Sequence, residues 1–265
     1  MVKQLTNSLS IKLVEAVDRL RSMAYEETTA RPDRVASWRS LPILGLKALF
    51  VAHARVRMTI GSEPLSYAWG YGRGTQIHRD YVEVFLGENS DLIRGQCLEF
   101  KDRNYTVRFG GSRVGVSDIL HVDDTNSDAN IVADLTEHNS IPSDTYDCII
   151  CTHVLHIVFE MQAIVREMRR ILRPGGALLV AVPASSMNGL GGDELWRITK
   201  EGLTMLLRTA FEPENVLVKG YGNSLLAAGE LRGLVKQEFS RAELDFYDPH
   251  YPIEVCGRAI KSSAL

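Results

Sequence analysis

The stretch YDCIICTHVLHIVFEMQAIVREMRRILRPGGALLVAVP, residues 146–183, decides the fold of this chain of 265 residues. It opens on a short apolar run, residues 146–151, typical of a strand buried on both faces of a parallel sheet. Apolar side chains then recur at helical spacing over residues 164–172, and a Pro-Gly-Gly turn ends that helix. A second apolar run covers residues 177–182. Strand, helix and strand in this order predict a right-handed βαβ unit.

Similar apolar runs flank this unit on both sides. The further predicted strands cover residues 96–100, 113–119, 130–135, 216–219 and 253–260, and further helices are predicted over residues 200–209, capped by Thr199, and 224–238. Alternation of strands and helices predicts an α/β fold, a Rossmann-like, doubly wound and mostly parallel sheet of seven strands. Ligands of such sheets bind at the carboxyl ends of the strands. Three acidic residues, Glu99, Asp118 and Asp134, end the upstream strands or lie near their ends, so we expect them at the ligand edge.

The composition is that of an ordinary globular protein, with 45% apolar and 24% charged residues. The net charge of −3 argues against a general nucleic-acid binder, which is usually strongly basic. No uncharged run reaches the roughly 18 apolar residues of a membrane span. Glu15 and Asp18 interrupt the region where a signal peptide has its apolar core, and four cysteines do not indicate a secreted disulfide scaffold. We therefore expect a cytoplasmic protein without a membrane span and without a nucleic-acid partner.

The charge is unevenly distributed along the chain. Residues 1–60 hold ten Lys and Arg against five Asp and Glu, so they carry +5 and the remaining residues carry −8. Apolar residues recur at helical spacing over residues 11–20 and again over residues 43–58, with Pro32 between them. We predict that residues 1–60 form a helical extension, a lid or the contact of a homodimer, and that residues 61–265 form the main domain.

An ordered set of motifs resembles a class I S-adenosylmethionine-dependent methyltransferase over residues 92–261. The set comprises Glu99, Asp118 about 20 residues later, Asp134, the sequence TYDCIICTHVLHI and the turn RRILRPGG. The stretches GYGRGTQIHRDYVEVFL, NYTVRFGG and NIVADLT are similar to a bacterial subgroup linked to glycan or natural-product modification. The resemblance implies S-adenosyl-L-methionine as cofactor and transfer of its methyl group to O or N of a small molecule in biosynthesis.

One departure from the family lies directly after the first strand. The family has the loop Glu/Asp-x-Gly-x-Gly-x-Gly there, but this chain has Glu99-Phe100-Lys101-Asp102-Arg103-Asn104-Tyr105. Either the loop takes another path around a retained cofactor, or cofactor binding is weakened or lost. The second reading makes the chain a non-catalytic, methyltransferase-like binding or scaffold protein. A nicotinamide-dependent oxidoreductase on a similar sheet is a third class, but G-x-G-x-x-G is absent after the first strand.

The resemblance assigns roles to individual residues. The candidate cofactor contacts are Arg73, Tyr81, Glu99, Phe100, Asp118, Ile119, Asp134, Leu135 and Thr152. Asp118 takes the place of the ribose ligand, with Asp123 and Asp124 as rivals, and a solvated strand-end acid is the plain alternative. Asp134 takes the place of the acid at the adenine amino group, with Leu135 beside it.

Other assigned roles concern the methionine half of the cofactor. Glu99 either orients the loop after the first strand or meets the methionine ammonium. Arg73 and Tyr81 close over the methionine carboxylate, although a salt-bridged surface position fits Arg73 as well. Thr152 lies beside the sulfonium.

Two histidines after the fourth strand are candidates for a catalytic base. Methyl transfer is an in-line displacement, so the enzyme aligns the reactants and removes a proton where the acceptor requires it. His153 is the first candidate and His156 the second, with a purely structural role as the alternative for both. The aromatic residues Tyr67, Trp69, Tyr71 and Trp196 form either an apolar substrate wall or ordinary packing. Cys148 and Cys151 point to opposite faces of a predicted strand, so we expect no metal site.

Overall fold

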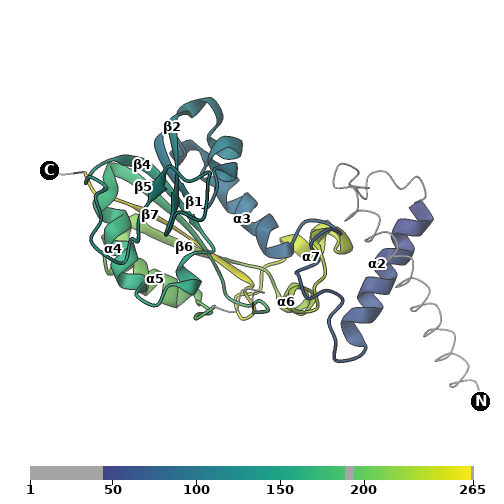
Figure 1. Cartoon of the computed structure of the whole chain (residues 1–265). Helices are drawn as coiled ribbons and strands as arrows, with labels where there is room; N and C mark the ends of the chain where they lie inside the picture. Colours follow the sequence, from purple (N-terminus) through teal and green to yellow (C-terminus); the bar gives the residue numbers. More distant parts are fainter. Residues whose placement is uncertain (1–43, 189–193, 264–265) are drawn as a thin grey trace, which may run out of the picture. The chain divides into compact units, whose positions relative to one another are not determined.

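The computed structural model describes residues 44–188 and 194–263 (Figure 1). These residues form two compact units. The first contains the described residues up to Ile77 together with Ala228–Leu244, and the second contains His78–Ala227 and the residues from Asp245 onward.

The second unit is built on a sheet of seven strands. The strands are β1 (Gly95–Phe100), β2 (Val114–His121), β3 (Ile131–Val132), β4 (Tyr146–Thr152), β5 (Leu172–Pro183), β6 (Val216–Tyr221) and β7 (Glu254–Ile260). Their order is β3-β2-β1-β4-β5-β7-β6. β7 runs antiparallel to both of its neighbours, whereas the other pairs are parallel. The prediction of a mostly parallel, seven-stranded α/β sheet is confirmed.

Helices of the second unit flank its sheet (Figure 1). The helices of the described chain are α2 (Leu44–Thr59), α3 (Ile77–Glu88), α4 (Met161–Ile171), α5 (Lys200–Arg208), α6 (Ser224–Leu231) and α7 (Arg241–Asp245). α4 buries the apolar stripe that its sequence predicted, and its partners in the core are the fully buried residues of β4 and β5. α5 begins at Thr199, whose hydroxyl accepts a hydrogen bond from the Gly202 amide at 3.0 Å, as predicted for a cap.

Several element boundaries differ from the sequence prediction. β3 covers only Ile131–Val132 of the predicted residues 130–135, and β5 begins at Leu172, so it includes the Pro-Gly-Gly segment. β2 continues past Asp118 to His121, because Ile119 and Leu120 are buried and pair in register with Glu99 and Phe100 of β1. Asp118 therefore lies inside the strand and not at its end. The helix predicted over residues 224–238 ends at Leu231, followed by Gly233 in the left-handed conformation, which is a common helix terminator.

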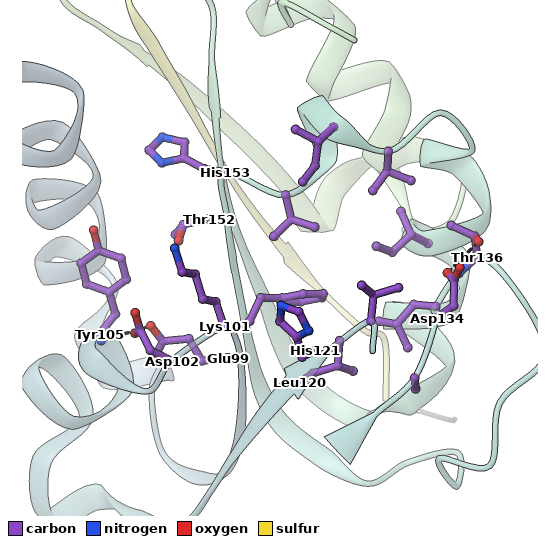
Figure 2. A pocket seen from close by; sticks show the side chains of 18 of the residues that line it. Glu99, Lys101, Asp102, Tyr105, Leu120, His121, Asp134, Thr136, Thr152 and His153 are labelled. Atoms are coloured by element: carbon purple, nitrogen blue, oxygen red, sulfur yellow. Dashed lines mark hydrogen bonds between the residues drawn. The ribbon is translucent and has the colours of Figure 1, made fainter. Parts of the chain in front are cut away.

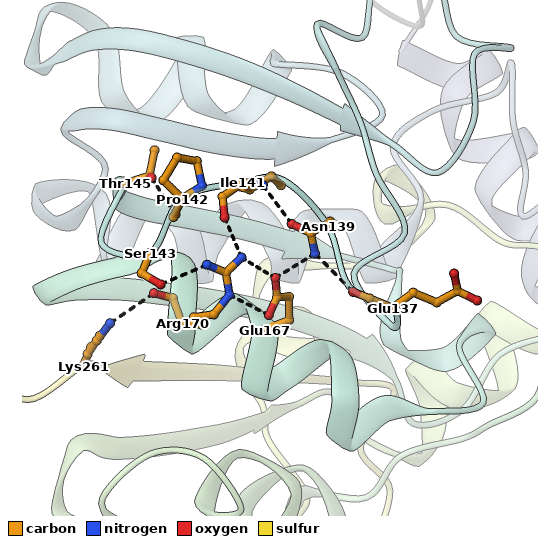
Figure 3. A network of polar contacts seen from close by, with 9 residues as sticks. All are labelled: Glu137, Asn139, Ile141, Pro142, Ser143, Thr145, Glu167, Arg170 and Lys261. Atoms are coloured by element: carbon orange, nitrogen blue, oxygen red, sulfur yellow. Dashed lines mark hydrogen bonds and ion pairs between the residues drawn. The ribbon is translucent and has the colours of Figure 1, made fainter.

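An arginine fixes the loop that leads into β4 (Figure 3). Arg170 of α4 donates hydrogen bonds to the Ile141 carbonyl at 2.6 Å and to the Ser143 hydroxyl at 2.9 Å. Glu167 bonds the same guanidinium and also accepts from the Asn139 side chain at 2.7 Å. The loop before β4 is thus tied to the helix that follows β4, which holds the strand in place at its amino end.

The first unit contains the helix expected over residues 43–58, which is α2. Arg55 of α2 lies over the ring of Phe239 at 4.4 Å and forms an ion pair with Glu243 at 2.6 Å. The helix expected over residues 11–20 lies outside the described residues, and the domain boundary near residue 60 remains a prediction. In the described part of the chain, no helix is both long and apolar enough to cross a membrane.

Candidate cofactor and catalytic site

The carboxyl ends of four neighbouring strands line one pocket of the second unit (Figure 2). Its volume is about 570 Å³, within the range of small-molecule sites. Each strand end contributes residues, either the last residues of the strand or those that follow it: Glu99, Phe100, Lys101 and Asp102 at β1, Leu120, His121 and Val122 at β2, Ala133, Asp134, Leu135 and Thr136 at β3, and Thr152, His153 and Val154 at β4. It lies at the edge of the sheet where the fold predicts a ligand.

The loop after β1 keeps a glycine-like backbone without a glycine. Lys101 stands where the resembling family has its first loop glycine, and its φ is +74°. Such a left-handed conformation costs a residue with a side chain about 1–2 kcal/mol. Two hydrogen bonds hold the strained peptide: the Lys101 amide donates to the Leu120 carbonyl at 3.0 Å, and the Lys101 carbonyl accepts from the Asn126 side chain at 2.7 Å.

Glu99 holds the rest of this loop. Its carboxylate is buried and accepts hydrogen bonds from the amides of Tyr105, at 3.1 Å, and Thr106, at 2.7 Å. Burial raises the pKa of Glu99 to about 7, although these hydrogen bonds oppose the rise. Of the two roles considered for Glu99, this geometry corresponds to orienting the loop.

At β2, the acidic candidate of the sequence does not reach the pocket. Asp118 is buried, and its carboxylate accepts from the side chains of Asn130 at 2.6 Å and Gln96 at 3.3 Å. The residue of β2 that does line the pocket is His121, whose Nδ1 lies 2.9 Å from Asp123 Oδ1. The strand is longer than its local sequence indicated, and this moves Asp123, the rival candidate, to the strand end.

After β3, Asp134 and Leu135, both candidates from the sequence, line the pocket. Asp134 Oδ1 accepts from the Thr136 amide at 2.8 Å and from its hydroxyl at 2.7 Å. These bonds fix the carboxylate, and within the described chain its Oδ2 atom is left without a hydrogen bond. Leu135 is buried beside it and supplies apolar surface.

After β4, a histidine and a buried glutamate form a pair. His153 has φ +53°, and its amide donates to the Ala181 carbonyl at 2.8 Å. Its Nε2 lies 3.0 Å from Glu254 Oε1, the first residue of β7. Glu254 is fully buried, and its Oε2 has no hydrogen-bond partner among the described residues. Sequence reasoning missed Glu254, although an acidic residue at the start of a buried strand was a usable signal.

The second histidine candidate lies outside the pocket lining. His156 is buried, its nearest carboxylate is Glu194 at 3.9 Å, and its ring centroid is 6.1 Å from that of His153. Burial lowers the pKa of His156 to about 4. The ring of His78 in α3 also contacts that of His153, edge to face, with centroids 5.1 Å apart.

The remaining candidates are distributed over both units. Phe100 and Thr152 line the pocket, whereas Ile119 lies within β2 outside the lining. Tyr81 is buried and stacks on Tyr221 with centroids 5.4 Å apart. Arg73 belongs to the first unit and bonds the Gly233 carbonyl at 2.5 Å and Glu238 at 3.3 Å.

The aromatic candidates are divided in the same way. Tyr67, Trp69 and Tyr71 belong to the first unit. In the second unit the Trp196 indole donates to the Val158 carbonyl at 3.0 Å, and its ring lies 5.9 Å from that of Phe159.

Comparison with known proteins gives one family match. The family model described as "Methyltransferase domain" matches residues 117–180, from β2 to β5 and less than half of the chain. A search of curated proteins gave no match.

Solved structures with a similar fold include three at low sequence identity. A SAM-dependent methyltransferase from Archaeoglobus fulgidus is 13% identical, with 69% of this chain and 94% of that chain covered and a TM-score of 0.47. A possible histamine N-methyltransferase from Thermotoga maritima is 16% identical, with 70% and 92% covered and a TM-score of 0.48. The cyclase SpnF is 17% identical, with 83% and 96% covered and a TM-score of 0.47.

The assignment rests on the sheet itself and on the family match. The strand order with an antiparallel β7 between β5 and β6, the match over β2 to β5 and the pocket at the strand ends agree with one another. Residues 117–180 are thus similar to a methyltransferase domain, and they lie within a sheet that has the expected seven-stranded, Rossmann-like topology.

Proposed function

We propose that this protein transfers the methyl group of S-adenosylmethionine to an oxygen or nitrogen atom of a small-molecule acceptor. The observation that carries the proposal is the pocket that runs across four strand ends, from Asp134 after β3 to the His153–Glu254 pair beside β4. The cofactor is elongated, with adenosine at one end and the methionine part at the other. Its length and polarity fit such a pocket, and when bound it supplies an electrophilic methyl group.

The adenosine part fits the β2 and β3 ends. Asp134 presents Oδ2 as an acceptor for the adenine amino group, and Leu120 and Leu135 supply apolar surface. For the ribose hydroxyls we favour His121 together with Oδ2 of Asp123. Asp123 uses Oδ1 for its bonds to His121 and Thr125, whereas both oxygens of Asp118 bond Asn130 and Gln96. Ionised carboxylates accept only, so a neighbouring pair of hydroxyls is a suitable partner.

His153 is the proposed base. When its Nε2 donates to Glu254, its Nδ1 is the nitrogen that is able to take a proton from the acceptor. Glu254 is a positioning residue that fixes the orientation of the ring, as the third member does in catalytic triads. His156 is less suited, because its pKa near 4 makes it a weak base and because it lies outside the pocket lining.

Exposed apolar side chains beside the pocket support an acceptor with an apolar portion. Ile157, which lines the pocket, is 47% exposed, and Phe159 next to Trp196 is 70% exposed. Large exposed apolar groups at a pocket are typical of ligand contacts. Of the acceptor classes in the resembling subgroup, a natural product with an apolar ring system agrees with these residues better than a glycan does.

We propose that residues 1–60 take no direct part in methyl transfer. They act as a lid or as the contact of a homodimer in the cytoplasm. A chain that begins at Gly61 is then expected to lose activity or its native oligomeric state. Full activity in the native oligomeric state would contradict this role.

Calorimetry with S-adenosylmethionine and S-adenosylhomocysteine tests the proposal. The wild-type protein should bind both, and Asp134→Ala should weaken both by about tenfold or more because a hydrogen bond to the adenine is lost. Asp128→Ala is the matched control, because Asp128 is exposed in the loop between β2 and β3 and does not line the pocket. Binding of neither compound would contradict the proposal and favour the non-catalytic alternative.

A further inference from the structure

Lys101 is in a conformation that glycine would adopt at lower cost. Its φ of +74° places it in the left-handed region, and the resembling family has glycine at this position. Hydrogen bonds to Leu120 and Asn126 hold its peptide in that conformation from both sides. A strained residue that the surroundings maintain is a reason to look for a function of its side chain.

The side chain of Lys101 lies in the pocket. Figure 2 shows it extending from the end of β1 toward Thr152 at the end of β4, away from Asp134 and Thr136. The ammonium is therefore in the half of the pocket opposite to the proposed adenine site. Within the part of the chain that the structure describes, Lys101 Nζ takes part in no hydrogen bond or ion pair.

The acidic groups nearest along the chain already have partners of their own. Both oxygens of Glu99 accept backbone amides, and Asp102 Oδ1 accepts from the Asn104 amide at 2.9 Å. The other cation of the lining, Arg79, bonds the Tyr105 hydroxyl at 3.2 Å. Lys101 is thus a positive charge in the pocket with an unused capacity to bind an anion.

We propose that the ammonium of Lys101 binds the carboxylate of the cofactor's methionine part. This inference rests on the proposed function, since it takes the adenosine to lie at the β2 and β3 ends. The methionine part is then at the β1 and β4 ends, where Lys101 lies, and its carboxylate is the anionic group that an ammonium recognises. The charge of one lysine thereby supplies affinity in a loop whose glycines have been lost.

The test compares two ligands that differ in the methionine part. S-adenosylhomocysteine carries the carboxylate, whereas 5′-methylthioadenosine has the same nucleoside and sulfur but no amino-acid group. Calorimetry should show that Lys101→Met lowers the affinity for S-adenosylhomocysteine about tenfold and changes the affinity for 5′-methylthioadenosine less than twofold. Lys101→Arg should retain most of the affinity because it keeps the charge.

Arg103→Met is the matched control, because Arg103 is exposed in the same loop and does not line the pocket. It should leave both affinities within twofold of wild type. Lys101→Met removes the charge alone, whereas Lys101→Gly removes the charge and the backbone strain, so comparing the two variants separates these effects. Lys101→Gly should lower the affinity for S-adenosylhomocysteine as much as Lys101→Met does.

Three outcomes overturn the proposal. If Lys101→Met lowers the affinity for both ligands equally, Lys101 only shapes the loop. If it leaves both affinities unchanged, Lys101 does not contact the cofactor. Wild-type protein that binds neither ligand overturns the proposed function together with this inference, so the two failures are distinguishable.

Discussion

The ends of β1 and β4 are neighbours in the sheet, and each is followed by a non-glycine residue in the left-handed conformation. Lys101 has φ +74° and His153 has φ +53°. The amide of each donates to a carbonyl of an adjacent strand, Leu120 for Lys101 and Ala181 for His153. The backbones are therefore strained and held in the same way.

Their side chains differ. The His153 ring is fixed by a hydrogen bond to the buried Glu254, whereas the Lys101 ammonium has no partner in the described residues. A fixed ring suits proton transfer, which needs defined geometry, and a free cation suits the capture of a charged ligand. The two proposed roles, proton transfer by His153 and carboxylate binding by Lys101, would thus rest on similarly strained backbones in one pocket.

The largest expected effect concerns His153. His153→Gln should lower kcat for methyl transfer by about a hundredfold, within the range that general bases contribute. The affinity for S-adenosylhomocysteine should stay within about threefold of wild type. The kcat is measured with an acceptor found by screening hydroxyl, phenol and amine compounds. The affinity is measured by calorimetry.

Glu254→Gln should lower kcat about tenfold with little change in KM, because it acts through the orientation of His153. His250→Gln is the control, since His250 is exposed and lies outside the pocket. A wild-type kcat in His153→Gln would show that His153 is not the catalytic base.

A second effect, on stability, is expected from His153→Gly. Glycine relieves the backbone strain, but it leaves the Glu254 carboxylate buried without its hydrogen bond. The unpaired buried charge should dominate and lower the free energy of unfolding by about 1–3 kcal/mol. Urea unfolding measures this change, and a variant more stable than wild type would show that the pair contributes little.

Glu99, which holds the loop of Lys101, should make stability depend on pH. Its pKa in the folded protein is about 7, above the usual value, so the folded state binds the Glu99 proton more tightly than the unfolded state does. The stabilisation of the folded state by this proton is therefore present at low pH and is lost as the pH rises through 7. Between pH 5.5 and 7.5 the free energy of unfolding of the wild type, relative to Glu99→Gln, should fall by about 2 kcal/mol. His156 titrates alike in both proteins, so it cancels in the difference. A difference that is independent of pH would contradict the raised pKa.

The smallest effect is expected from Lys101→Gly. Here no side-chain partner within the described chain is lost, and relief of strain should raise the free energy of unfolding by about 0.5–1 kcal/mol. Substitution by glycine is thus expected to lower the free energy of unfolding at His153 and to raise it at Lys101. Destabilisation at Lys101 measured by urea unfolding would mean that its side chain packs in the folded protein.

Local sequence was sufficient for the core of this fold. The unit over residues 146–183 could be predicted because β4 and β5 are apolar runs buried on both faces and α4 carries a clear apolar stripe. Asp134, Leu135, Thr152 and His153 line the pocket, and they could be placed at the ligand edge from sequence because each lies at the end of a strand or within three residues of it.

The rest depended on contacts between distant segments. The end of β2 is set by its pairing with β1, so local sequence placed the strand end at Ile119 instead of His121. Glu254 meets His153 across 101 positions of sequence. The left-handed conformation of Lys101 is imposed by Leu120 and Asn126, and nothing in a lysine indicates it.

A crystal structure with S-adenosylhomocysteine tests the central claim most directly. The ligand should lie across the strand ends, with its adenine amino group at Asp134 and its sulfur between Lys101 and His153. Its carboxylate should lie within hydrogen-bond distance of Lys101 Nζ. A ligand bound in the reverse direction, or bound outside this pocket, would contradict the account.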